Sequence, residues 1–228
     1  MDKEKYLKKY HKNVQIIVKD FEQIDEIPIS WKNILKQSNM NDKIEKTIDL
    51  WNKYMGLQFR NTIRYLKEKL VGIELIKYGE KYSLLYSILS SNNKILYYEG
   101  GNPNGKLLFG KLEKEWESFD KSIINFYQNL HDGFFYYASE SMGLLPVQDI
   151  VYFDDEEWGI IEELETPLEI CLATTFGIFA SGMGGYVAID TSCYDKSKAT
   201  LWFTNRQPSY NIDFWDIVDE WTVIGMQG

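Results

Sequence analysis

Apolar residues in this chain switch between the spacing of helices and the spacing of strands, and this switch limits the choice of fold. From Asn41 to Leu70 they recur every three or four residues, as on one buried helix face. The stripe consists of Ile44, Ile48, Trp51, Met55, Phe59, Ile63 and Leu66. Asn41 is the predicted N-cap of this helix, because an Asn side chain can accept a hydrogen bond from the free N–H groups of a first turn.

Strand patterns follow the helical stripe. The runs Tyr82–Leu89 and Ile95–Gly100 flank the turn sequence SSNN, which predicts an antiparallel hairpin. Before the stripe, residues 1–25 have an amphipathic pattern that predicts a helix, and Pro28 would interrupt any continuation of it.

The C-terminal part repeats this alternation. Residues 113–130 return to helical spacing in Trp116, Phe119, Ile123, Phe126 and Leu130. Strand patterns follow, and residues 211–225 predict a closing helix with Asn211 or Asp213 near its N-cap. The chain is therefore predicted to be α+β. Residues 113–228 would form a mixed or antiparallel sheet packed by helices, and residues 1–112 an extension of helices and antiparallel strands, with a shared core left open.

Charge is distributed unevenly over the 228 residues. Residues 1–112 carry 20 Lys and Arg against 13 Asp and Glu, whereas residues 113–228 carry 5 against 21. The acidic part would repel nucleic acid and attract a basic protein. Basic residues of the first part mostly alternate with acidic ones, as on a solvated helix surface, so no nucleic-acid partner is expected.

Targeting signals are not evident in the sequence. The start is polar, with no apolar stretch of a secretory signal behind it, and no apolar run approaches the roughly 18 residues of a membrane span. The two cysteines, Cys171 and Cys193, are too few for a disulfide framework or a four-ligand zinc site. We expect two reduced thiols in a cytoplasmic protein with no membrane partner.

The glycine-rich stretch SGMGGYVAIDTS, from Ser181 to Ser192, raises the question of a phosphate site. A Walker loop would end in Gly-Lys-Ser or Gly-Lys-Thr, but Tyr186 and Val187 follow the last glycine here. A dinucleotide fingerprint would open a helix, whereas YVAID has the pattern of a strand. The glycines therefore predict a tight turn between two strands.

Catalytic and metal-binding patterns are weak. The only histidines are His11 and His131, and a pair between His131 and Cys171 or Cys193 has no local support. Consecutive acids such as those at 154–157 do not follow the alternate spacing of calcium loops. We therefore expect no cofactor, no metal and no enzymatic activity.

The acidic residues after position 153 fit either a solvated face or a docking surface for a basic partner. A Trp bordered by carboxylates has the composition of an interface anchor, although a core Trp fits equally well. The predicted partner-binding residues are Asp154, Asp155, Glu156, Glu157, Trp158, Glu162, Glu163 and Glu165.

The order of segments in residues 113–228 is similar to that of a known superfamily. A helix leads to NFYQNLHDGF, then GLLPVQDIVYF, the strand pair FGIFASGMGGYVAIDTS, the strand ATLWFTN and the helix SYNIDFWDIVDEW. In this order the chain resembles the SMI1/KNR4 (SUKH) superfamily, although LHDG stands where an Asn-Gly turn is usual. The residues that occupy the family's pattern are Gly143, Leu144, Gly184, Gly185, Asp190, Phe214 and Trp215.

The resemblance implies a binding protein. Many bacterial members look like cytoplasmic immunity proteins that bind and block a toxin encoded beside them, and no catalytic residues are shared across the family. Other members, notably fungal ones, act as regulatory interaction modules. We therefore expect an immunity protein whose partner is a basic toxin, such as a nuclease. A regulatory scaffold of the same fold, an enzyme using the acidic cluster or a Cys–His pair, and a homodimer remain open alternatives.

Overall fold

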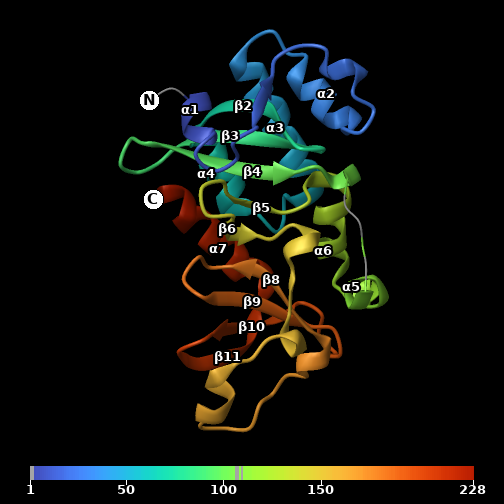
Figure 1. Cartoon of the computed structure of the whole chain (residues 1–228), viewed down its shortest axis with the longest axis vertical. Helices are drawn as coiled ribbons and strands as arrows, with labels where there is room; N and C mark the ends of the chain where they lie inside the picture. The colour runs from blue at the N-terminus through green and yellow to red at the C-terminus, as the bar shows by residue number, and fades with distance from the viewer. Residues whose placement is uncertain (1–2, 106–107, 109) are drawn as a thin grey trace.

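Every strand in the described part of the chain belongs to one antiparallel sheet, which runs along the longest axis of the molecule (Figure 1). The computed structural model describes residues 3–105, 108 and 110–228. The strands are β1 (Gln15–Ile17), β2 (Leu70–Tyr78), β3 (Lys81–Leu89), β4 (Ile95–Gly101), β5 (Phe134–Tyr136), β6 (Ser141–Leu144), β7 (Val151–Tyr152), β8 (Thr175–Ala180), β9 (Gly185–Asp190), β10 (Lys198–Phe203) and β11 (Arg206–Asp213). Their order is β1-β2-β3-β4-β5-β6-β8-β9-β10-β11, and β7 pairs with β8 next to β6.

The helices lie mainly on one face of this sheet. They are α1 (Lys3–Leu7), α2 (Ile29–Leu35), α3 (Met40–Met55), α4 (Arg60–Lys69), α5 (Gly110–Glu115), α6 (Lys121–Asn125) and α7 (Phe214–Gln227). Helices α2 to α7 all contribute buried residues to one core that follows the sheet from β2 to β10. The α+β class predicted from the sequence is therefore confirmed.

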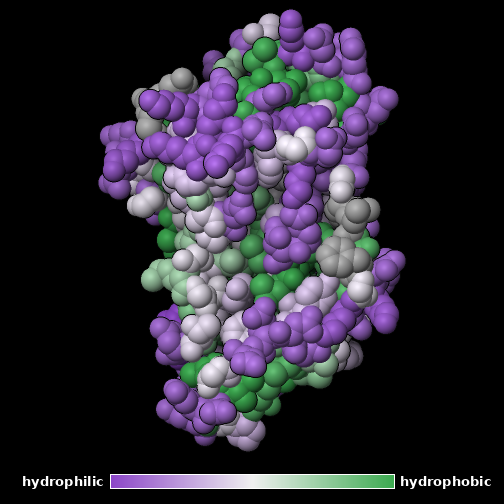
Figure 2. All heavy atoms as spheres, viewed as in Figure 1, coloured by the Kyte–Doolittle hydropathy of each residue, from purple (hydrophilic) through white to green (hydrophobic). Residues whose placement is uncertain are grey.

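The opposite face of the sheet has two separate covers. The N-terminal residues around α1 and β1 pack over β2 to β5, and the buried residues of this cluster are Leu7, Val14, Ile76, Leu85, Tyr97 and Tyr137. A second cluster lies over β9 and β10, and its buried residues are Phe153, Ile160, Ala188 and Trp202. Figure 2 shows the molecule in the same view as Figure 1. Hydrophilic residues cover much of the surface in this view, and hydrophobic residues are visible between them, among other places at mid-length and toward the end that carries β11.

The helical stripe predicted between Asn41 and Leu70 is buried as expected except at Ile44, which is half-buried, and it belongs to two helices. Helix α3 ends at Met55 and α4 begins at Arg60. The stripe continues across the break because Phe59, in the connection, is fully buried and packs edge-on against Trp51 of α3. Periodicity in the sequence therefore identified the buried face but not the end of the first helix.

The N-cap residues of the two long helices were predicted correctly for one helix and not for the other. The side chain of Asn39 caps α3 and accepts the N–H of Asp42 at 2.9 Å, so the prediction of Asn41 as N-cap is wrong by two residues. For the last helix, Asp213 is the N-cap, as one of the two predicted candidates. The other candidate, Asn211, lies in β11 with a φ of 59°.

The helix predicted over residues 1–25 is wrong. Helix α1 covers only the first turns, and β1 then pairs with the edge of β2, with Ile16 opposite Ile76. This edge would otherwise present unpaired backbone groups, so pairing with it favours a strand over a long terminal helix. Tertiary contact here outweighs local pattern.

Residues 113–130 bury all five predicted apolar side chains, but not in one helix. The chain forms α5, a short 3₁₀ segment, α6 and a π-helical stretch, Phe126–Leu130. Asp120 starts α6 anew because its side chain accepts the N–H of Ser122.

The sheet and the main core continue across the predicted boundary between residues 112 and 113, which falls inside α5. Strand β4 pairs with β5, and α4 packs against α7. The helix contact is fixed by the buried carboxylate of Asp219 in α7. It accepts the N–H of Asn61 at 2.9 Å and the N–H of Thr62 at 2.8 Å, and so caps the first turn of α4 from a distant part of the chain.

Replacing Asp219 with Ala is expected to lower the free energy of unfolding by about 2 to 3 kcal/mol, because two N–H groups at a helix N-terminus lose their charged acceptor. Urea unfolding followed by circular dichroism measures this loss. Glu220→Ala, an exposed neighbour on the same helix, is the control and should change stability by less than about 0.5 kcal/mol. Equal losses in the two variants would contradict the assigned role of Asp219.

Close contact between β5 and β6 gives a second prediction. A Cβ atom at Gly143 would lie 2.0 Å from the backbone oxygen of Phe134, whereas a Cβ at Gly159 would meet nothing within 4 Å. Gly143→Ala should therefore destabilise the protein by about 2 kcal/mol or more through overpacking against backbone. Gly159→Ala should be nearly neutral. Thermal unfolding of both variants tests this difference, and a Gly143→Ala variant as stable as the wild type would contradict it.

Candidate functional site

The predicted partner-binding residues lie on one stretch, residues 153–170, which we call the acidic segment. It follows β7 and crosses the face of the sheet opposite the main core. Its apolar side chains pack toward β9 and β10, and these are Phe153, Trp158, Ile160, Ile161, Leu164, Leu168 and Ile170. All seven predicted carboxylates point away from this packing and are exposed, namely Asp154, Asp155, Glu156, Glu157, Glu162, Glu163 and Glu165. The sequence therefore brings one charged surface and one buried surface to a single segment.

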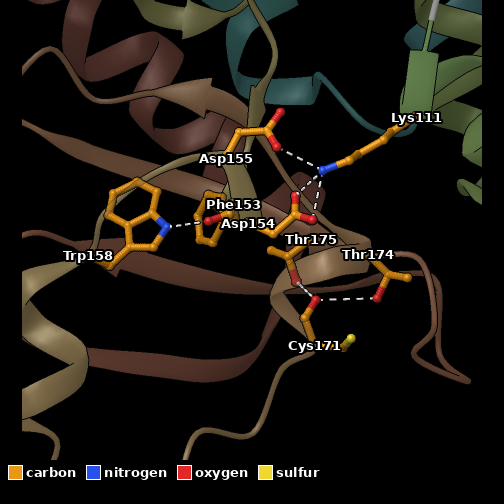
Figure 3. Close-up of polar contacts among 8 residues, drawn as sticks. All are labelled: Lys111, Phe153, Asp154, Asp155, Trp158, Cys171, Thr174 and Thr175. Carbon is orange, nitrogen blue, oxygen red and sulfur yellow. Dashed lines mark hydrogen bonds and ion pairs between the residues drawn. The ribbon is translucent and has the colours of Figure 1, made fainter.

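Two of these carboxylates are already paired within the chain. Lys111 lies 2.7 Å from Asp154 and 2.8 Å from Asp155, so one ammonium group bridges both (Figure 3). These hydrogen bonds raise the pKa of Lys111. These ion pairs join the start of the acidic segment to α5. They also neutralise part of the negative charge of Asp154 and Asp155, which leaves less of it for a partner.

The other five carboxylates, Glu156, Glu157, Glu162, Glu163 and Glu165, form no ion pair within the described residues. They sit on a segment with little regular hydrogen bonding of its own beyond 3₁₀ turns. Their position depends on the apolar side chains beneath them and on a few polar ties.

Trp158 is half-buried and packs against the apolar cluster beneath the acidic segment. Its ring lies 4.7 Å from that of Phe153 and 5.4 Å from that of Trp202, measured between centroids. Its indole N–H donates to the carbonyl of Phe153 at 2.7 Å (Figure 3). The geometry thus gives Trp158 an internal contact that supports the segment, and whether it also touches a partner stays a prediction.

Polar ties hold the far end of the acidic segment. The side chain of Gln207 in β11 donates to the carbonyl of Glu163 at 2.9 Å and accepts the N–H of Glu165 at 3.1 Å. Just beyond, the carbonyl of Cys171 accepts the hydroxyls of Thr174 and Thr175 (Figure 3). The segment is therefore attached to the sheet at both ends.

The glycine-rich stretch is the hairpin turn between β8 and β9, as predicted. Gly182 and Gly184 both have a φ of 74°, a conformation that glycine adopts without strain. The hydroxyl of Ser181 accepts the N–H groups of Met183 and Gly185, which closes the turn. These two N–H groups are thus used within the turn itself.

His131 lies in the main core. Its side chain is fully buried, and its Nε2 lies 2.7 Å from the hydroxyl of Tyr86, which also accepts the indole N–H of Trp51 at 3.0 Å. Burial lowers the pKa of His131 to about 3, so the ring is neutral at physiological pH. Among the described contacts of His131 none involves a cysteine, and Cys171 is exposed, which gives no geometric support to a Cys–His pair.

A second site was missed by the sequence reasoning. A cavity of about 390 Å³ opens on the second face of the sheet, beside the cover formed by the N-terminal residues, and we call it the Glu99 pocket. Residues from both parts of the chain line it, from His11 and Tyr78 to Phe135 and Asp149. Glu99 of β4 lies in its wall and is only 2 % exposed. Such burial is unusual for a glutamate.

Glu99 is held by two hydroxyl groups. Its Oε1 accepts the hydroxyl of Tyr78 in β2 at 2.6 Å and that of Ser83 in β3 at 2.7 Å. Its Oε2 accepts no hydrogen bond within the described residues. Loss of hydration on burial raises the pKa of Glu99, and the two hydroxyl donors only partly oppose this effect.

One signal in the sequence could have identified this residue. Glu99 stands in the strand pattern LYYEGG, at an alternate position to Tyr98, which faces the main core. A charged residue on such a strand would be solvent-exposed if the second face were open. The second face is instead partly covered, and Tyr78, which donates to Glu99, is itself stacked against His11 of the N-terminal residues, whose position the sequence did not predict.

Glu99→Gln is expected to change stability in a pH-dependent way. Because the folded state raises the pKa of Glu99, its protonated form is favoured in the fold, and the carboxylate costs stability as the pH rises above about 4.5. The stability of the variant relative to wild type should therefore increase between pH 4 and pH 8, by about 1.4 kcal/mol for each unit of pKa shift. Urea unfolding across this range measures it. A difference that is constant with pH would contradict burial of an ionisable Glu99, and Glu156→Gln, at an exposed site, is the control.

Comparison with known proteins adds no assignment to these two sites. In the residues that the structure describes, no helix is both long and apolar enough to cross a membrane, and no group of three His, Cys, Asp or Glu side chains is arranged to hold a metal ion. The chain matches no protein-family model, no curated protein and no solved structure.

Proposed function

We propose that this chain is an immunity protein that binds a basic toxin through the acidic segment and thereby neutralises it in the cytoplasm. The observation that carries the proposal is the group of five exposed carboxylates that form no ion pair with any residue the structure describes, held on a segment that is tied to the sheet at both ends. A fixed array of like charges costs less to order on binding than a flexible tail does.

Electrostatics favours a basic protein as the partner. Residues 113–228 carry 5 Lys and Arg against 21 Asp and Glu, and Lys111 compensates only Asp154 and Asp155 within the acidic segment. Such a field increases the rate at which an oppositely charged protein finds the surface, and it disfavours nucleic acid directly. A nuclease toxin, whose own surface must attract nucleic acid, has the complementary charge.

Resemblance of residues 113–228 to the SMI1/KNR4 superfamily supports the same function. We infer that the strands β8 to β11 and the closing helix α7 correspond to that fold, with residues 1–112 as an extension that shares its sheet. Binding, rather than catalysis, is what this family implies. Inhibition would then follow from occlusion or locking of the toxin domain in a stoichiometric complex.

A regulatory scaffold of the same fold is the second candidate. It is supported by the same exposed acidic surface, because a peptide or a signalling protein with basic residues would fit it as well. The two functions differ in the number of partners. An immunity protein binds one toxin in a defined ratio, whereas a scaffold binds several proteins.

The test begins with the tagged full-length chain as bait in its native bacterial cytosol, with mass spectrometry as the readout. One stoichiometric partner that contains a basic toxin domain, and whose toxicity the chain suppresses on co-expression, is the expected result. Several unrelated partners without toxicity would favour the scaffold. Failure of the chain to suppress the toxicity of a bound partner would overturn the immunity function.

The binding surface is tested by charge reversal. The triple variant Glu156→Lys, Glu157→Lys and Glu162→Lys should lower the association rate with the partner at least tenfold at low salt, because the attractive field is reversed at the contact. Stopped-flow or surface plasmon resonance at several salt concentrations measures this rate.

The control for this experiment is a triple reversal with the same change of net charge at exposed sites on the helices of the other face, namely Glu45→Lys, Glu68→Lys and Glu220→Lys. It should lower the rate much less. If both triple variants bind alike, the acidic segment is not the contact, whatever the function of the chain.

A further inference from the structure

We propose that the Glu99 pocket binds a small organic cation, a short aliphatic diamine, with one ammonium group at Glu99 and the other at the rim. The pocket is separate from the acidic segment and shares none of its residues. This inference therefore stands independently of the toxin partner.

The buried end of the pocket presents a carboxylate oxygen that needs a donor. Glu99 Oε1 is occupied by the hydroxyls of Tyr78 and Ser83, whereas Oε2 has no donor within the described residues. Buried carboxylates are ordinarily paired with a positive charge, since hydroxyl groups supply hydrogen bonds but no compensating charge. Burial favours the protonated form of Glu99 while the pocket holds no cation, and an ammonium group at Oε2 would replace that proton and supply both the hydrogen bond and the charge.

Charge around the cavity also selects a cation. Six carboxylates line it, those of Glu26, Glu80, Glu99, Asp132, Glu140 and Asp149. The basic residues in the wall are Lys81, which is exposed, and His11, whose pKa is lowered by burial. The field inside is therefore negative, and an anionic ligand would be repelled.

The walls suit a hydrocarbon chain between two charged ends. Phe135 lies directly opposite Glu99 in the sheet and is almost fully buried, and Pro146 adds a second apolar surface. The ring of Tyr78 is stacked on His11 at 4.2 Å between centroids, which closes the side next to the N-terminal cover. Methylene groups packed here would leave water, and the aromatic rings tolerate a nearby ammonium group.

The rim provides the second anchor. Glu140 and Asp149 both line the cavity and are exposed, and one oxygen of Glu140 lies 3.1 Å from His11 Nε2. Burial lowers the pKa of His11, so a neutral ring there leaves the negative charge of Glu140 to pair, with Asp149, with a second ammonium group that stays partly hydrated. The cavity volume of about 390 Å³ lies within the range of small-molecule sites. A metal ion is a poorer fit, because among the described residues no three acidic, His or Cys side chains converge on one point.

Isothermal titration calorimetry on the full chain tests the proposal with three probes of similar length: 1,4-diaminobutane, n-butylamine and 1,4-butanediol. The diamine should bind saturably at one site. The monoamine should bind several-fold more weakly because it lacks the rim contact, and the uncharged diol should give no saturable heat. Absence of saturable diamine binding up to about 10 mM, equivalent to less than roughly 3 kcal/mol of binding free energy, would overturn the proposal.

Two variants locate the two ends of the ligand. Glu99→Gln keeps an oxygen for the hydroxyls of Tyr78 and Ser83 but removes the charge, and it should weaken diamine binding at least tenfold. The double variant Glu140→Gln and Asp149→Asn changes only exposed groups, and it should reduce diamine affinity toward that of the monoamine. Unfolding curves of each variant show that the fold is intact.

The matched control is the double variant Glu156→Gln and Glu157→Gln, which removes the same charge from the acidic segment. It should leave diamine affinity within about twofold, because these side chains do not line the pocket and, being exposed, are screened by salt. If Glu99→Gln binds the diamine as tightly as this control does, or if the diol binds like the diamine, the cation site is refuted.

Discussion

Strand β5 joins the two parts of this molecule through its pairing with β4 and with β6, and most of the remaining architecture depends on it. Strand β5 pairs with β4 on one side and with β6 on the other, so these few residues carry the sheet from the first part of the chain into the second. The backbones of β5 and β6 approach so closely that Gly143 has no room for a Cβ atom beside Phe134. Because the sheet is continuous there, one face can be covered by a single helical core.

The same continuity makes the second face too long for one cover. The N-terminal residues cover β2 to β5, and the acidic segment covers β9 and β10, each around its own apolar cluster. The Glu99 pocket opens beside the first cover, and the exposed carboxylates lie on the second, so both candidate sites result from how this face is closed.

Periodicity in the sequence predicted the buried stripe of α3 and α4, the hairpin of β3 and β4, the turn at Gly182 and the α+β class, because each depends on neighbouring residues. The run of acidic residues after position 153 predicted exposed carboxylates, since consecutive acids can rarely be buried. Neither periodicity nor composition could predict contacts between distant segments. Asp219 caps a helix that begins more than 150 residues earlier, and β1 replaces a predicted helix by pairing with β2. Glu99 is held by Tyr78, which stacks against His11 from the N-terminal residues.

The two candidate sites use negative charge over different distances. Carboxylates of the acidic segment are solvated, so each contributes little at contact and their combined field acts mainly on encounter, within about 8 to 10 Å at physiological salt. Glu99 is removed from water, so salt screens it poorly and it acts only on a group that enters the pocket. A buried carboxylate without a charged partner also lowers the stability of the fold. A purely structural role would be served better by a neutral residue at this position, and this is the physical reason to regard Glu99 as a binding residue.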